Sequence, residues 1–137
     1  MPTSTWVYVS VSNVPAPAME EELARIVDVS RIRNARMSVT GALLFTGVRF
    51  AQCIEGPETG VAAIRQSIAS DTRHAAVTTL MEGPIAQRRF SDWSLAYAGP
   101  SPSVRTAINR AMREAGPVAG GGGAALRDLL GELASQP

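Results

Sequence analysis

The order in which hydrophobic periodicities follow one another restricts the fold of this chain more than any other feature. A short run rich in aromatic and β-branched residues alternates between two faces, which indicates a strand, and apolar residues then recur at helical spacing. Two apolar runs joined by a short glycine-containing connection follow, a pattern typical of a β-hairpin. In chain order, the predicted elements are a strand at Trp6–Val11, a helix from Met19 to Arg33, strands at Ser38–Phe45 and Arg49–Glu55, a helix from Pro57 to about Asp71, and strands at Ala76–Leu80 and Ser94–Tyr97.

Strand, helix, hairpin, helix, strand is the ferredoxin-like order. It predicts an α/β (α+β) fold, a ferredoxin-like βαββαβ mixed sheet with one extra strand. Right-handed crossovers place both helices on the same face of such a sheet. The opposite face therefore needs another cover.

Two C-terminal helices are predicted to supply this cover or to pack on another subunit. The first begins at Ser101-Pro102 and ends before Gly116-Pro117. The apolar stripes are Val104, Ala107, Ile108, Ala111 and Ala115 in the first helix, and Leu126, Leu129, Leu130 and Leu133 in the second. The Gly120–Gly123 run before the second stripe is predicted to be a flexible joint. The chain is thus divided into a core, residues 1–98, and a helical extension, residues 99–137.

The composition is that of a globular domain, and the charge gives no indication of binding to nucleic acid or to an anionic membrane. Hydrophobic residues make up 45% and charged residues 18% of the chain, and the formal net charge is +1. No global field would draw the chain to nucleic acid or to an anionic membrane, and no apolar run approaches the roughly 20 residues needed to span a bilayer. Cys53 is the only cysteine, so we expect no disulfide, no metal site and a cytoplasmic location.

Tyr8 and Gln52 are the candidate functional side chains that the strand pattern singles out. Each lies in the middle of a predicted strand, so that its position is set by a sheet and not by a loop. A glutamine between apolar neighbours on a core face must find a polar partner. The alternative is a purely structural role, in which Gln52 bonds to the backbone or to Tyr8 and stabilises the core. Tyr8 would then be an ordinary strand tyrosine with a solvent-exposed hydroxyl, which is common.

Five local strings, in this order, closely resemble the BLUF family, the sensors of blue light using flavin. They are Val7-Tyr8-Val9-Ser10, Ser30-Arg31-Ile32-Arg33-Asn34, Val39-Thr40-Gly41-Ala42-Leu43-Leu44, Phe50-Ala51-Gln52-Cys53-Ile54-Glu55-Gly56 and Arg88-Arg89-Phe90-Ser91-Asp92-Trp93. The resemblance extends from Trp6 to about Tyr97, and only the helical character is similar beyond that point. No single string is diagnostic, whereas the ordered set is specific.

The resemblance implies roles for residues that match the family's motifs. Tyr8 corresponds to the electron-donating tyrosine, Gln52 to the switching glutamine, and Asn34 to the asparagine that bonds the polar edge of the isoalloxazine ring. Arg33 stands where relatives often have His or Asn. Arg73, with His74 beside it in the sequence, matches a segment at the phosphate end of the flavin, where a cation is physically reasonable; a solvent-facing His74 is the alternative.

Two further positions resemble the family's signalling residues. Trp93 matches a tryptophan near the last strand, although it could be an ordinary core aromatic. Leu95 stands at the position of a methionine, and leucine lacks the polarisable thioether. The resemblance also implies that a flavin lies between the first two helices. The aliphatic walls of that slot would be Ile26, Val27, Ile64 and Ile68, any of which could instead be plain core.

The predicted function is therefore blue-light reception through a noncovalently bound flavin, FAD in preference to FMN. No nucleophile–base pair, metal cluster or phosphate-binding glycine loop is present in the sequence, so we expect no enzyme. Signalling would pass through the C-terminal helices to a homo-oligomer or a downstream protein. The alternatives are a ferredoxin-like interaction module without flavin and a flavin enzyme that works in the dark.

Overall fold

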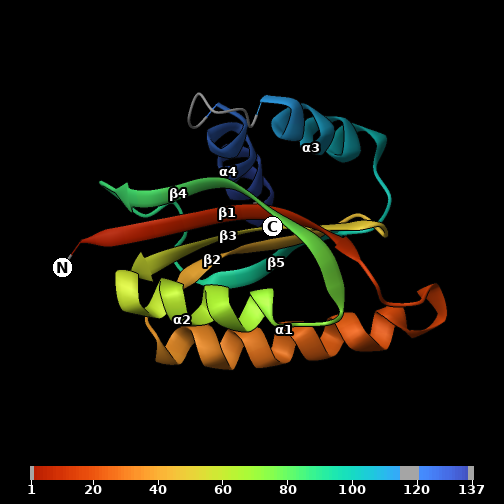
Figure 1. Ribbon diagram of the computed structural model, residues 1–137, viewed down its shortest axis with the longest axis horizontal. Coiled ribbons are helices and arrows are strands. Elements are labelled where there is room, and N and C mark those ends of the chain that lie inside the picture. The colour runs from red at the N-terminus through yellow and green to blue at the C-terminus, as the bar shows by residue number, and fades with distance from the viewer. Residues whose placement is uncertain (1, 115–120, 136–137) are drawn as a thin grey trace.

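The computed structural model describes residues 2–114 and 121–135. They form five strands, one 3-10 helix and four α-helices (Figure 1). The elements are β1 (Thr3–Ser12), η1 (Ala16–Ala18), α1 (Met19–Arg36), β2 (Thr40–Phe45), β3 (Arg49–Pro57), α2 (Glu58–Ala69), β4 (His74–Ile85), β5 (Trp93–Ala98), α3 (Pro102–Glu114) and α4 (Gly121–Ala134). None of the described helices is both long enough and apolar enough to cross a membrane.

The strands form one mixed sheet in the order β4-β1-β3-β2-β5. β3 lies between β1 and β2 and is antiparallel to both, β4 pairs antiparallel with β1, and β5 pairs parallel with β2. The first four strands have the ferredoxin-like arrangement, and β5 is the additional strand. Helices α1 and α2 cover one face of the sheet, and α3 and α4 lie on the other (Figure 1). The predicted fold class is confirmed.

The alternation of side chains along β1 separates two hydrophobic cores. Trp6 and Tyr8 belong to the core under α1 and α2, whereas Val7 and Val9 belong to the core under α3 and α4. Because successive residues of a strand point to opposite faces, one six-residue run contributes to both cores. The site-bearing strands are therefore buried on both faces.

Strand β4 is longer than the sequence indicates. We predicted Ala76–Leu80, and the strand extends from His74 to Ile85. Its pairing with β1 shifts register at two places, and Ala76 has a positive φ of 52°. Both irregularities lie between Ala75 and Met81, and the missed end, Met81–Ile85, pairs regularly with β1. That end contains Gly83-Pro84, a pair typical of turns that is tolerated here because β4 is an edge strand.

The predicted flexible joint at Gly120–Gly123 is wrong for the glycines that the structure describes, because α4 already begins at Gly121. A Cβ at Gly122 would lie 2.0 Å from the backbone oxygen of Ala111 in α3, and one at Gly123 would lie 2.5 Å from that of Leu80 in β4. The glycines thus permit close packing of α4 against its neighbours. The predicted helix end at Gly116-Pro117, together with Ala115 and Gly120, lies outside the described residues.

We expect Gly122→Ala to lower the free energy of unfolding by about 1–3 kcal/mol through overpacking. Gly131→Ala is the matched control, because the nearest atoms to its Cβ, with Nε at 2.2 Å, belong to the flexible side chain of Arg89 and not to backbone. Both changes gain the helix propensity of alanine, about 1 kcal/mol, so the difference between them reports the clash. Denaturant unfolding measures both; equal stabilities would show that α4 does not depend on a close approach at Gly122.

Candidate functional site

Tyr8, Gln52 and Trp93 form a buried hydrogen-bonded chain beneath α1 and α2. Tyr8 and Gln52 are direct partners in the antiparallel pairing of β1 with β3. Gln52 Nε2 donates to the Tyr8 hydroxyl at 2.7 Å, and Trp93 Nε1 donates to Gln52 Oε1 at 2.9 Å. The three side chains belong to residues that are only 2%, 4% and 6% exposed. The nitrogen and the oxygen of this buried amide therefore each have a partner within the protein.

The tryptophan fixes the orientation of the glutamine amide. An indole N–H can only donate, so the amide group that faces Trp93 must be the oxygen. The nitrogen of Gln52 is then left to face Tyr8, whose hydroxyl accepts. The Tyr8 proton remains free to be donated elsewhere, and burial raises the pKa of this phenol above its ordinary value.

Aromatic neighbours hold the Tyr8 ring in place. Trp6 stacks on it with ring centroids 4.4 Å apart and planes 25° apart, and the Trp6 indole donates to Thr79 Oγ1 at 2.9 Å. The Arg65 guanidinium lies over the Trp6 ring, 4.8 Å from its centroid. Trp6 was not among the predicted site residues, although the alternation along β1 placed it on the same face as Tyr8.

A pocket opens beside this chain, between the sheet and helices α1 and α2. Its lining comprises Tyr8, Ile26, Val29, Ser30, Arg33, Leu43, Phe50, Gln52, Ser67, Ile68, Asp71, Arg73 and His74. Six of the predicted site residues are therefore brought together, namely Tyr8, Gln52, Ile26, Arg33, Arg73 and His74. Ile64 is fully buried in the adjoining core and does not line the pocket, and neither do Trp93 and Leu95.

Asn34 carries an unpaired amide group next to the pocket residue Arg33. The side chain is fully buried, and its Oδ1 accepts from Arg33 Nε at 3.1 Å. Its Nδ2 is the one buried side-chain polar atom within 2–114 and 121–135 that has no hydrogen-bond partner. A buried donor without an acceptor costs about 1–3 kcal/mol, so a bound group with a carbonyl oxygen would suit this position. The residues present thus fit the polar edge of a flavin ring.

Arg33 connects the two helices that form the pocket. Besides bonding Asn34, its guanidinium donates to Ser67 Oγ in α2 at 3.3 Å. Burial lowers the pKa of this guanidinium, although an arginine remains charged at neutral pH. A fixed cation beside Asn34 gives this end of the pocket a preference for electron-rich oxygen atoms.

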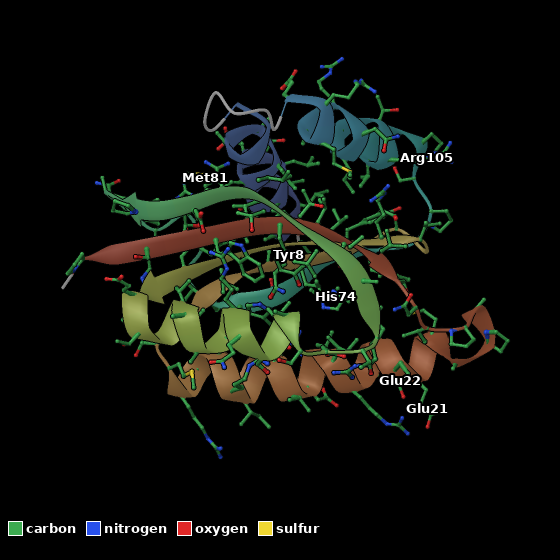
Figure 2. The ribbon with its side chains drawn as sticks, in the orientation of Figure 1. Tyr8, Glu21, Glu22, His74, Met81 and Arg105 are labelled. Carbon is green, nitrogen blue, oxygen red and sulfur yellow. The ribbon has the colours of Figure 1, made fainter. Side chains whose placement is uncertain are left out.

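The histidine at the start of β4 is not solvent-facing. His74 Nε2 lies 2.7 Å from the Ile68 carbonyl, which can only accept, so this nitrogen carries the proton; Nδ1 lies 2.7 Å from Ser10 Oγ. The ring also makes an edge contact with Tyr8, at 6.1 Å between centroids. Figure 2 shows Tyr8 and His74 on the side of the sheet that faces α1 and α2. The sequence alternative of a free histidine is excluded.

Arg73 is already neutralised by carboxylates. Its Nη2 lies 2.7 Å from Asp71 Oδ2, and its Nη1 lies 3.5 Å from Glu22 Oε2 in α1. Hydrogen bonding from Arg73 lowers the pKa of Asp71 and raises that of Arg73 itself. A phosphate group in the pocket would have to share Arg73 with these carboxylates or displace them from it.

The two remaining predicted side chains lie on opposite faces of the sheet. Leu95 is partly buried on the pocket face and pairs with Leu43 of β2. Cys53 is fully buried in the core under α3 and α4, and burial raises the pKa of its thiol to about 12. The thiol therefore stays protonated and is separated from the pocket by the sheet itself.

A pocket with a buried phenol and a glutamine amide at one wall, next to an unpaired asparagine donor, is suited to a flavin ring and points to a flavin-binding domain. The model of the BLUF family, described as sensors of blue-light using FAD, matches residues 4–96. This chain belongs to the BLUF family. It is accordingly a sensor domain that receives blue light through a flavin, and it is not itself an enzyme. The family supports neither the interaction module without flavin nor the dark flavin enzyme.

Similar proteins agree with this assignment. The photoactivated adenylate cyclase subunit beta of Euglena gracilis is 35% identical over 89 residues, which are 64% of this chain and 10% of that protein. This chain thus spans about a tenth of the length of that relative. The dark-state structure of BlrB, a BLUF protein, superimposes with a TM-score of 0.72 at 29% identity and covers 98% of both chains. BlrP1 of Klebsiella pneumoniae with FMN and cyclic diGMP gives a TM-score of 0.59 at 29% identity over 69% of this chain and 26% of that one.

Proposed function

We propose that Tyr8 and Gln52 are the photoactive pair of this sensor and that its flavin lies between α1 and α2. The observation that carries the proposal is the buried chain from Trp93 through Gln52 to Tyr8 at the wall of the pocket. Its amide has one possible orientation in the dark, because an indole donor fixes it. A switch requires such a defined starting state.

A flavin excited by blue light is a strong one-electron oxidant, which is the chemistry that the cofactor supplies. Tyr8 would give one electron to the excited flavin, and its hydroxyl, then strongly acidic, would give its proton to the same acceptor. The Gln52 amide would turn or change to its imidic acid tautomer while Tyr8 is a radical. Tyr8 would then take back its electron and its proton from the flavin, so that only the hydrogen bonding has changed.

Rotation of Gln52 has a direct consequence for Trp93. A turned amide brings Nε2 to the position where Oε1 accepts from the indole, and two N–H donors then face each other. The contact must open, so Trp93 and the beginning of β5 respond to the state of Gln52. Leu95, two residues further along β5, offers no sulfur to take over the hydrogen bond.

Four polar side chains are suited to hold the cofactor. Asn34 would donate its unpaired Nδ2–H to a ring carbonyl, with Arg33 beside it. Arg73 and His74 also line the pocket and would suit the phosphate part of the flavin, which would take the place of Asp71 beside Arg73. Ile26 forms an apolar wall, and Ile64 supports it from the core.

The experiment that tests the function is the absorption spectrum of the purified protein before and after blue light. A yellow protein whose flavin band shifts reversibly to the red supports the photoreceptor. A colourless protein that ignores added flavin would favour the interaction module. Bleaching of the band in the dark upon addition of a substrate would favour a flavin enzyme.

We expect the flavin to be FAD and to be released intact on denaturation. FAD is the cofactor that the family description names, whereas one similar structure holds FMN. No covalent link is expected, because Cys53 lies on the face of the sheet opposite the pocket. Chromatography of the released cofactor and mass spectrometry of the illuminated chain measure both points. A protein-bound flavin mass after illumination would contradict the prediction, and released FMN would correct the cofactor.

We propose that the helical extension, residues 99–137, transmits the light signal of the flavin-binding core, residues 1–98. Its apolar residues Ile108, Leu126 and Leu130 pack against the face of the sheet that lies behind the pocket. A change in the sheet can therefore reach them, and through them a second copy of the chain or a separate protein. The single, unpaired Cys53 agrees with a reducing cytoplasm.

A further inference from the structure

A fully buried carboxylate, Glu55, lies on β3 three residues beyond Gln52 and takes no part in the pocket. Its Oε1 accepts from the backbone amides of Arg89 and Phe90 at 2.7 and 3.1 Å. Its Oε2 accepts from Nε and Nη2 of Arg127 at 2.9 and 2.6 Å. A buried carboxylate is tolerated only when it is paired and fully hydrogen-bonded, and Glu55 satisfies both conditions.

Arg127 is the α4 side chain that completes this arrangement. Besides binding Glu55, its Nη2 donates to the backbone oxygen of Gln87 at 3.0 Å, in the connection between β4 and β5. One guanidinium thus joins α4, β3 and that connection. Arg127 lies beyond residues 4–96, the part of the chain that matches the family model.

The connection held in this way leads directly to the site. Phe90 is buried, and Trp93 follows three residues later. Trp93 donates to Gln52, which is on the same strand as Glu55. Both sides of the Trp93–Gln52 hydrogen bond are therefore attached to Glu55, one through β3 and the other through the segment that precedes β5.

We propose that Arg127 is a positioning residue of the photoactive site, which acts through Glu55 to hold Trp93 against Gln52. The inference rests on the proposed role of Gln52. Because coupling between two sites is reciprocal, an opening of the Trp93–Gln52 contact weakens the hold on α4, and anything that moves α4 alters the lifetime of the opened contact. The Arg127–Glu55 pair links Gln52, on the pocket face of the sheet, to α4 on the other face.

The test is Arg127→Met in the full chain loaded with flavin, which removes the guanidinium and keeps an apolar stem. We expect the thermal return of the red-shifted state to change by on the order of 5-fold or more. We also expect the indole N–H signal of Trp93 in the NMR spectrum to shift upfield in the dark, with and without flavin, as its hydrogen bond weakens. The chain has two tryptophans, so Trp93→Phe assigns the signal.

Arg89→Ala is the matched control. Arg89 lies in the same connection, and its side chain also reaches α4, with Nη2 donating to the Asp128 backbone oxygen at 3.3 Å. It does not touch Glu55 through its side chain, and alanine keeps the backbone amide that does. The recovery rate and the indole signal should match those of the wild type, and a shift equal to that of Arg127→Met would overturn the proposal.

A double variant, Glu55→Gln with Arg127→Met, separates positioning from neutralisation of a buried charge. It leaves no unpaired ion, so folding should survive even where the single variant is unstable. If Arg127 positions Trp93, both readouts stay altered. If both return to wild-type values, Arg127 merely neutralises Glu55 and the proposal is wrong. A wild type that ignores light would instead overturn the proposed function, whereas the indole signal of the flavin-free protein still tests the positioning.

Discussion

Tyr8→Phe is expected to bind flavin as the wild type does and to show no light-induced red shift. The ring volume and the stacking on Trp6 are kept, but the hydroxyl that loses a proton is gone. The amide nitrogen of Gln52 also loses its acceptor, so we expect a loss of about 1–3 kcal/mol in the free energy of unfolding. Difference spectra under continuous blue light measure the effect.

The second tyrosine of the chain provides the control for this variant. Tyr97 packs on the opposite face of the sheet, and its hydroxyl donates to the Pro100 carbonyl at 3.2 Å near the surface. Tyr97→Phe should keep a full red shift, since no path joins its hydroxyl to the pocket. A wild-type red shift in Tyr8→Phe would assign Tyr8 to core packing alone.

Gln52→Leu is expected to abolish the red shift for a different reason. The side chain keeps its approximate size but loses both the donor to Tyr8 and the acceptor from Trp93. The Trp93 indole is left buried without an acceptor, which costs about 1–3 kcal/mol. The dark absorption band should shift because the flavin loses a hydrogen-bonding neighbour, and illumination should leave the shifted band unchanged.

Gln66→Leu makes the same substitution on the exposed surface of α2. It should leave both the dark spectrum and the red shift as in the wild type. A reversible, wild-type red shift in Gln52→Leu would remove the glutamine from the mechanism. Denaturant unfolding of both variants shows whether any loss of signal comes from loss of the folded state.

The topology was predictable because it depends on local patterns repeated over whole elements. The alternation through Trp6–Val11 and the helical spacing after Met19 each involve many residues, so single exceptions do not hide them. The extent of β4 and the packing of the glycines at the start of α4 were not predictable in this way. Gly83-Pro84 has the composition of a turn although it pairs with β1, and a glycine run has the same composition whether it bends freely or packs closely.

The sequence by itself determined the order of the elements and the face on which each strand residue lies. Tyr8 and Gln52 fall on the pocket face and Cys53 on the other, because the period of a strand is two whatever its neighbours are. A family resemblance added roles to these positions. It did not say which atoms meet.

Only the tertiary structure decided the partners. The direct pairing of Tyr8 with Gln52 depends on strand register, the bond from Trp93 depends on how β5 joins β2, and the contact of Arg127 with Glu55 joins residues 72 positions apart. Such contacts are set by distances of a few ångströms between elements that are remote in the sequence. Local propensity contains no information about those distances, whereas a hydrogen bond is lost when they change by about 1 Å.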